Sequence, residues 1–209
     1  PPDPMLDRRE CRRRFGLEPE GRVVLVVGGS QGARAVNEAL LGAIERVVAG
    51  TLPPRPDGLQ VLWATGTAHI AGIEERLRHL DGAEWVHAFG YIDDMPAALA
   101  AADIAVSRAG AMATAELLAW GIPSILVPLP TAAADHQTGN ARALAEAGAA
   151  VHLPQHQATP ERLWTELTSL ATSDARREAM AACARARARP QAARDIAQRL
   201  LTLVERRAA

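Results

Sequence analysis

The chain contains six short apolar runs. Most of them are nearly continuous in hydrophobic character rather than alternating between apolar and polar positions. Strands buried on both faces show this pattern, and it favours a parallel sheet. The strands predicted in this way cover residues 22–28, 60–66, 85–90, 104–110, 124–129 and 149–154.

Helical patterns separate these runs, at about residues 34–49, 69–80, 94–102, 111–120 and 137–147. This alternation of strand and helix predicts an α/β fold, an open parallel sheet of about six strands with helices on both faces. In such a sheet, ligands bind at the carboxyl ends of the strands, near the point where the strand order reverses.

After Pro160 the pattern becomes entirely helical, over about residues 160–172, 174–187 and 190–207. We expect these helices either to pack on the flank of the sheet or to reach toward a partner. The opening "PPDP" carries no methionine and is typical of a fragment or of a chain that starts at a linker. The predicted organisation is a linker and first helix (1–20), a ligand-binding core (21–159) and C-terminal helices of the same domain (160–209).

Composition narrows the function classes. A chain of 209 residues can bury roughly 70% of its unfolded surface, so it needs neither a disulfide nor a metal for stability. The net charge of −1 gives no overall positive field, which argues against a nucleic-acid partner. Cys11 and Cys183 lie far apart and indicate structural thiols in a reduced, cytosolic protein. No apolar run reaches the roughly 20 residues needed to span a bilayer, and there is no signal peptide.

The first candidate for chemistry is the loop "GGSQG", which follows the first strand. Gly28, Gly29 and Gly32 permit a sharp turn and a close approach by a ligand, and Ser30 offers a hydroxyl. The start of the next helix supplies free N–H groups, so the loop can seat a phosphate. A tight turn with no ligand explains the same residues equally well. The spacing matches neither the dinucleotide fingerprint nor the Walker pattern.

The segment "SRAGAMATAELL" is more informative. A strand ends near Arg108, and small residues then open a helix whose first N–H groups remain accessible. Arg108 adds a cationic fork suited to phosphate oxygens. Glu116, further into the helix, is placed to accept hydrogen bonds from ribose hydroxyls, although an acid near a helix start is also simply stabilising.

Two further polar clusters have competing interpretations. After the fifth strand, "ADHQTGN" places His136, Gln137 and Asn140 at a loop-to-helix junction. These groups suit sugar hydroxyls, and helix capping by Asp135 is the alternative. The pair in "IDDM" resembles a metal site, but adjacent residues at a helix start point apart, so we predict that one aspartate caps the helix.

Taken together, "GGSQGAR", "GYIDDMPAALAAADIAVSRAGAMATAELLAWGIPSILVPLP" and "DHQTGNARALAEAGAA" resemble the C-terminal half of the MurG family, the bacterial N-acetylglucosaminyltransferases that form lipid II (glycosyltransferase family 28). The three motifs occur in the family's order over about residues 21–151. The resemblance implies a GT-B enzyme, in which two Rossmann-like domains face each other and the C-terminal one holds the nucleotide sugar. It implies inverting transfer of N-acetylglucosamine from UDP-N-acetylglucosamine (UDP-GlcNAc) to lipid I, with no cofactor and no required chelated metal.

Carried over by position, the resemblance implies that Ser30, the glycines of its loop and Arg108 contact the diphosphate, and that the backbone of Ile92 meets the uracil. His136, Gln137 and Asn140 would read the sugar. The run around the diphosphate and ribose would comprise Ala111, Met112, Ala113, Thr114, Ala115 and Glu116. The family's Asn-Pro-x-Arg element is not matched in "PPDPMLD", and a usual Gln is His136 here.

The resemblance also implies partners that lie outside this chain. The family's N-terminal half carries the lipid I site and the face that rests on the cytoplasmic side of the membrane. We assign no catalytic residue with the residues present; His136 is titratable, but it falls on the donor side. We therefore expect the chain to bind UDP-GlcNAc weakly and to transfer nothing alone. The alternatives are a subunit of a two-chain transferase, an epimerase-like domain and a non-catalytic binding module.

Overall fold

The computed structural model describes residues 2–3, 5–29 and 31–208. Its centre is a six-stranded, fully parallel sheet in the order β3-β2-β1-β4-β5-β6. All six predicted strands are present: β1 (Arg22–Val27), β2 (Leu59–Ala64), β3 (Val86–Phe89), β4 (Ile104–Ser107), β5 (Ser124–Leu126) and β6 (Ala150–His152). The strand order reverses between β1 and β4, the two central strands.

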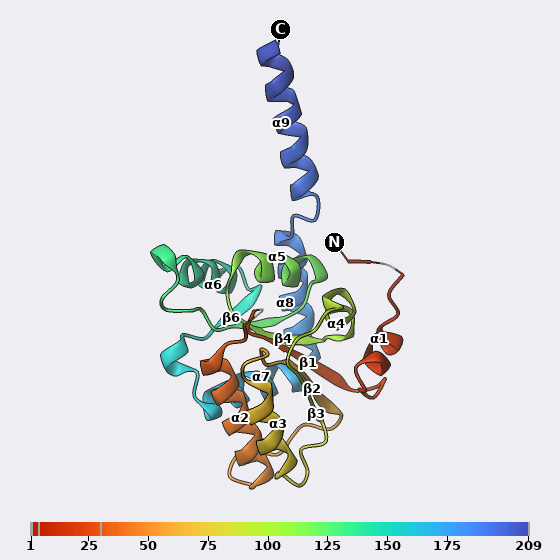
Figure 1. The fold of residues 1–209 in the computed structure, drawn as a ribbon, viewed down its shortest axis with the longest axis vertical. Helices are drawn as coiled ribbons and strands as arrows, with labels where there is room; N and C mark the ends of the chain where they lie inside the picture. The colour runs from red at the N-terminus through yellow and green to blue at the C-terminus, as the bar shows by residue number, and fades with distance from the viewer. Residues whose placement is uncertain (1, 4, 30, 209) are drawn as a thin grey trace.

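Helices connect successive strands and then continue beyond the sheet (Figure 1). Every predicted helix is found with its ends shifted by at most a few residues. The helices are α1 (Arg8–Arg14), α2 (Arg34–Val48), α3 (Ile70–Arg78), α4 (Met95–Ala101), α5 (Ala111–Trp120), α6 (His136–Glu146), α7 (Pro160–Thr172), α8 (Asp174–Arg187) and α9 (Ala192–Ala208), with short 3₁₀ turns η1 (Ala133–Asp135) and η2 (Gln155–Gln157).

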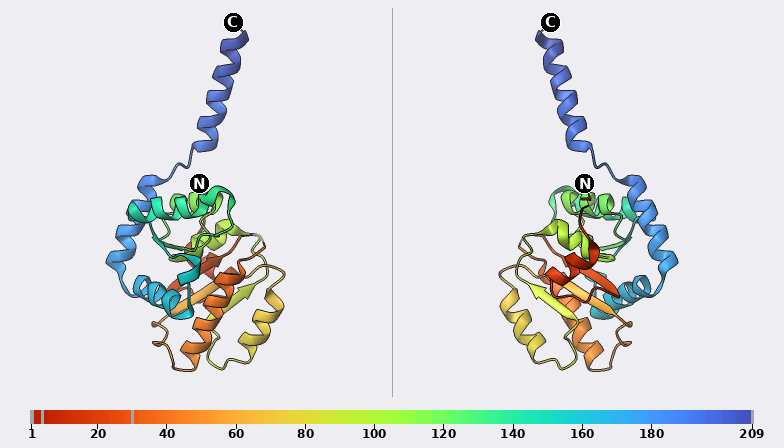
Figure 2. Two further views of the ribbon diagram at one scale, coloured as in Figure 1. Left: turned by 90° about the vertical axis from the view of Figure 1, so that its left-hand side faces the viewer. Right: turned by 90° about the vertical axis from the view of Figure 1, so that its right-hand side faces the viewer.

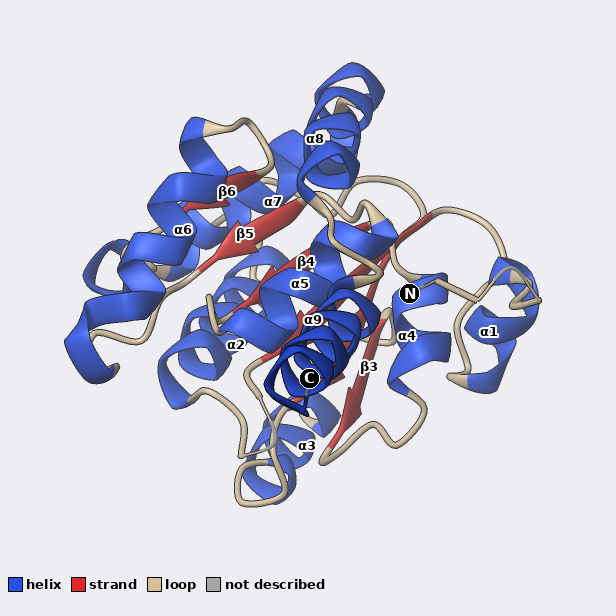
Figure 3. Ribbon diagram, turned by 90° about the horizontal axis from the view of Figure 1, so that it is seen from above, coloured by secondary structure: helices blue, strands red, loops and turns tan. Residues whose placement is uncertain are grey.

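The sheet is buried on both faces, as the continuous apolar runs predict (Figure 3). Along β1, Val24 and Val26 face a core formed with α2, α3 and α7. Val23 and Leu25 face the opposite core, which includes residues of α4, α5 and α6. α1 packs on α4 in a smaller cluster, and α8 contacts both α5 and α7. This arrangement brings six strand ends to each edge of the sheet.

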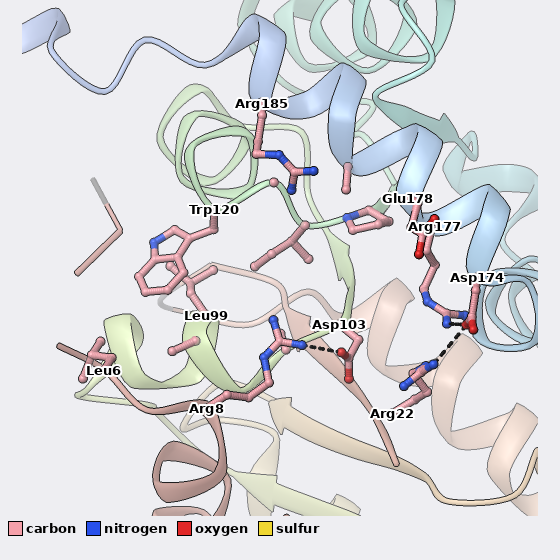
Figure 4. Close-up of a pocket in the computed structure, with 16 residues that line it drawn as sticks. Leu6, Arg8, Arg22, Leu99, Asp103, Trp120, Asp174, Arg177, Glu178 and Arg185 are labelled. Atoms are coloured by element: carbon pink, nitrogen blue, oxygen red, sulfur yellow. Dashed lines mark hydrogen bonds and ion pairs between the residues drawn. The ribbon is translucent and has the colours of Figure 1, made fainter. Parts of the chain in front are cut away.

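The amino edge of the sheet is held by ion pairs around a cavity of about 510 Å³. Asp103, just before β4, accepts hydrogen bonds from Arg8 and from the buried Arg12, both at 2.6 Å. Arg22 on β1 pairs with Asp174 at 3.0 Å (Figure 4). Through these pairs with Asp103 and Asp174, the network fastens α1 and α8 to the sheet.

The last helix leaves the body of the molecule. Figures 1 and 2 show α9 projecting beyond α8 without lying on either layer. Within the described residues, no helix combines the length and the apolar character that crossing a membrane requires.

Candidate functional site

A cavity of about 840 Å³ opens at the carboxyl edge of the sheet, where the strand order reverses. Its walls come from the ends of β1 and β4 and from the loops after β2, β5 and β6. The described residues that line it include Gly28, Gly29, Gln31, Gly32, Ala33, Arg34, Glu38, His69, Ser107, Arg108, Gly110, Ala113, Leu129, Thr131, Gln137 and Gln155. The cavity therefore brings together the two glycine-containing loops that the sequence singled out.

The first of these loops needs its glycines for shape. Gly32 has φ +75°, and a Cβ there would overlap the carbonyl oxygen of Thr65 on the neighbouring loop. At Gly28 a Cβ would overlap the backbone nitrogen of Ala33. The loop is thus folded tightly back on the start of α2. Ser30, which the resemblance places on the diphosphate, lies outside the described residues.

The helices that begin at the cavity are left without side-chain caps. α2 begins after Ala33 and α5 after Gly110, and in both cases no side chain bonds the first-turn N–H groups among the described residues. By contrast, Asp94 caps α4 and Thr159 caps α7. Two uncapped helix starts that open on one cavity supply N–H donors and partial positive charge to an anion.

Arg108 adds a full positive charge to this wall. Its guanidinium donates to the carbonyl oxygens of Val127 at 3.1 Å and Pro128 at 3.3 Å, which fixes the side chain beside the end of β5. Burial lowers the pKa of Arg108. Among the described residues, no carboxylate lies close enough to raise that pKa again. A half-buried cation that is held by neutral oxygens favours an anionic ligand.

The remaining charges on the wall do not cancel this potential. Glu38, the carboxylate among the lining residues, pairs with Arg34 at 2.7 Å. The wall formed by the described residues therefore keeps a net positive charge centred on Arg108.

Two residues predicted to contact the sugar, Gln137 and Asn140, also hydrogen-bond to the loops around the cavity. The side-chain oxygen of Gln137 accepts from the backbone N–H groups of Ala109 at 3.3 Å and Leu129 at 3.0 Å. Asn140 donates to the carbonyl oxygen of Ala109 at 3.0 Å. The start of α6 is thereby tied to the loops after β4 and β5, with Gln137 in the cavity wall.

Other predicted residues lie around the cavity rather than in its wall. Ile92 is buried in the core cluster that also holds Ala98 and Leu99 of α4. Glu116 borders a separate apolar cavity of about 40 Å³ that shares Val27, Ser107 and Ala113 with the main one. Thr114 is buried, and its hydroxyl donates to the carbonyl oxygens of Gly110 and Ala111.

Exposed positions complete the placement of the predicted site residues. Ala111, Met112 and Ala115 lie on the exposed side of α5. His136 is exposed at the start of α6, with Nδ1 2.8 Å from the carbonyl oxygen of Ala133. It does not line the main cavity.

The aspartate pair after β3 behaves as a helix start. The carboxylate of Asp94 accepts from the N–H of Ala97 at 3.0 Å, which confirms the predicted cap. Across the described residues, no three His, Cys, Asp or Glu side chains gather closely enough to hold a metal ion.

Sequence reasoning missed several wall residues, among them His69, Thr131 and Gln155. Each follows the carboxyl end of a strand, after β2, β5 and β6 respectively. Their position within a few residues of the end of an apolar run is the signal that could have found them, because carboxyl ends of parallel strands share one edge.

The comparisons with known proteins agree with this architecture. Residues 23–200 match the family described as "Glycosyltransferase family 28 C-terminal domain". The chain is 43% identical over 200 residues to the UDP-N-acetylglucosamine–N-acetylmuramyl-(pentapeptide) pyrophosphoryl-undecaprenol N-acetylglucosamine transferase of Salinibacter ruber, covering 96% of this chain and 51% of that protein. It is 44% identical over 177 residues to the transferase of the same description from Syntrophotalea carbinolica, covering 84% of this chain and 46% of that protein.

Solved structures give the same result. The crystal structure of Acinetobacter baumannii MurG superimposes with a TM-score of 0.75 and 29% identity, covering 95% of this chain and 54% of that one. A putative UDP-N-acetylglucosamine 2-epimerase from Listeria monocytogenes shares the fold, with a TM-score of 0.67 at 15% identity. The chain spans about half the length of the curated relatives it matches. From its profile match and its relatives, the chain belongs to glycosyltransferase family 28 and corresponds to that family's C-terminal domain.

Proposed function

We propose that this domain holds UDP-GlcNAc as the donor half of an inverting transferase that moves N-acetylglucosamine onto lipid I to make lipid II. The observation that carries the proposal is the pairing of two uncapped helix starts with Arg108 on one cavity. The two relatives that are 43% and 44% identical to this chain are named as N-acetylglucosamine transferases acting on N-acetylmuramyl-(pentapeptide) pyrophosphoryl-undecaprenol.

The proposed donor pose follows the order of the strands. The diphosphate lies at the centre, on the loop of Gly28, Gly29 and Gly32, the start of α5 and Arg108. The uracil lies toward Ile92 and the ribose toward Glu116, while the sugar lies toward His136, Gln137 and Asn140. Ser30 is assigned to the diphosphate by the family resemblance alone.

The chemistry of this half is stabilisation of the leaving group. As the sugar–phosphate bond breaks, negative charge builds on the departing UDP. N–H groups and a guanidinium that are already oriented toward that charge stabilise it without having to reorganise. Deprotonating the acceptor hydroxyl requires a base on the opposite side of the sugar, which we assign to the remaining half of the complete protein. That half is also proposed to carry the lipid I site and the contact with the cytoplasmic face of the membrane.

Calorimetric titration with UDP tests the donor assignment. We expect UDP to bind the purified chain, and Arg108→Met to weaken binding by about tenfold or more, because a charge-assisted contact is lost. Arg108→Lys keeps the charge without the fork and falls between the two. Arg22→Gln, at the opposite edge of the sheet, is the matched control and leaves the affinity unchanged. A wild-type chain that ignores millimolar UDP would contradict the proposal.

A transfer assay tests whether this chain needs the other half of the protein for activity. UDP-GlcNAc and lipid I are incubated with this chain alone, and then with a separately produced N-terminal half of a close relative. We expect product only in the second mixture. Turnover by this chain alone would show that the acceptor site and the base are contained within it.

A further inference from the structure

Gln155 lines the main cavity, and its side chain carries an oxygen that has no hydrogen-bond partner among the described residues. It opens the turn η2, directly after β6, and lines the cavity together with Gln137 and Thr131. Its side-chain oxygen Oε1 is buried and has no hydrogen-bond partner among the described residues. A buried polar atom without a partner costs free energy, so each such atom in a native protein calls for an explanation.

The neighbouring amides do not share this feature. The oxygen of Gln137 already accepts from two backbone N–H groups, and Asn140 already donates to Ala109. These two side chains hold the loops in place. Of these three amides, Gln155 is the one whose oxygen is buried without a hydrogen-bond partner among the described residues.

The chemistry of an amide oxygen limits what it can bind. It only accepts hydrogen bonds, and so do the oxygens of a diphosphate. Gln155 Oε1 therefore cannot be satisfied by the phosphates that Arg108 and the helix starts attract. It requires an O–H or N–H donor, which a nucleotide sugar offers on its sugar, ribose or base.

The order of the strands in the sheet indicates which of these donor groups, on the sugar, the ribose or the base, reaches Gln155. β3, which precedes Ile92, forms one end of the sheet, and β6, which precedes Gln155, forms the other. Glu116 borders the smaller cavity on the side of α4. With the nucleoside on that side and the diphosphate at the centre, the part of the ligand that reaches Gln155 is the hexosamine.

We propose that Gln155 is a sugar-reading residue of the donor site, with Oε1 accepting a hydrogen bond from a hydroxyl or the acetamido N–H of the hexosamine. The inference rests on the proposed function, because it places a nucleotide sugar in this cavity. It adds a recognition contact from the turn η2, after β6, that the three family motifs do not include.

The test compares two ligands on three proteins. Calorimetry measures the affinity for UDP and for UDP-GlcNAc in the wild-type chain, in Gln155→Met and in Gln157→Met, an exposed control on the same turn. We expect Gln155→Met to leave UDP affinity within about twofold while weakening UDP-GlcNAc by about five- to tenfold. The Gln157 control should change neither value.

Thermal unfolding of the free domain separates recognition from a structural role. Replacing an unsatisfied buried amide by an apolar group of similar size is expected to keep or raise the midpoint. Equal losses for both ligands, no loss for either, or a lowered midpoint would overturn the assignment of Gln155. If the wild-type chain binds neither ligand, the proposed function itself fails, and that result is distinguishable from the others.

Discussion

Gly29 and Gly32 share a left-handed backbone but differ in their surroundings, with φ values of +90° and +75°. At Gly29 an added Cβ would meet no atom of the described residues within 4 Å, whereas at Gly32 it would overlap the Thr65 carbonyl oxygen. We expect Gly29→Ala to destabilise the domain by roughly 1–2 kcal/mol, the cost of the left-handed conformation alone. Gly32→Ala adds backbone overlap and should cost roughly 3 kcal/mol or more. Urea unfolding measures both, and equal losses would contradict the role assigned to the Thr65 contact.

Some site residues can be predicted from sequence because they immediately follow an apolar run. Gly28 and Arg108 are of this kind, since the end of a buried strand places the next residues at the ligand edge. Long-range partners are not predictable in this way. That Gln137 accepts from Ala109 and Leu129 depends on how the loops after β4 and β5 pack against the start of α6.

At the scale of elements, the strands follow from their apolar character, but all six end one to three residues earlier than predicted. The prediction extends the fifth strand to residue 129, whereas β5 ends at Leu126. Val127 still donates to Ser107 at 2.8 Å, but Pro128 has no N–H group with which to continue the ladder. The shortened strand leaves the carbonyl oxygens of Val127 and Pro128 to Arg108, so the early end of β5 helps to build the site.

Asp103 joins three elements, and its removal tests that connection. Its carboxylate accepts from Arg12 of α1 at 2.6 Å and from the backbone N–H of Val23 on β1 at 2.8 Å. Because Arg12 is buried, Asp103→Ala leaves an uncompensated charge and should cost about 3–5 kcal/mol. Glu10→Ala breaks only an exposed pair with Arg13 and should cost less than about 1 kcal/mol. Denaturant unfolding of the two variants checks this; similar losses would mean that α1 is not anchored through Asp103.

For the whole molecule, two histidines link stability to pH. Burial lowers the pKa of His87 on β3, partly opposed by Glu18, and burial with Arg142 lowers the pKa of His152 on β6. As the pH falls through 6.5, the ordinary value, the unfolded chain therefore takes up protons first, and the free energy of unfolding decreases. A variant carrying His87→Gln and His152→Gln should show a shallower loss between about pH 7 and pH 5. Chemical denaturation across that interval measures the slope, and an unchanged slope would assign the loss to other groups.

Deletion of the projecting helix α9 tests whether this helix contributes to the stability of the folded body. Ile196, Leu200 and Leu203 are each 58–59% exposed, and among the residues whose burial is described, the three core clusters contain none from this helix. An isolated helix of this length is marginal in water, so α9 draws little stability from the body and returns little to it. Deleting residues 190–209 should therefore leave the thermal midpoint within about 2 °C of the intact chain, while removing its exposed apolar surface reduces self-association in sedimentation velocity. A midpoint lowered by more than about 4 °C would mean that α9 folds back onto the body in solution, because a shift of that size corresponds to more than about 1 kcal/mol of lost packing.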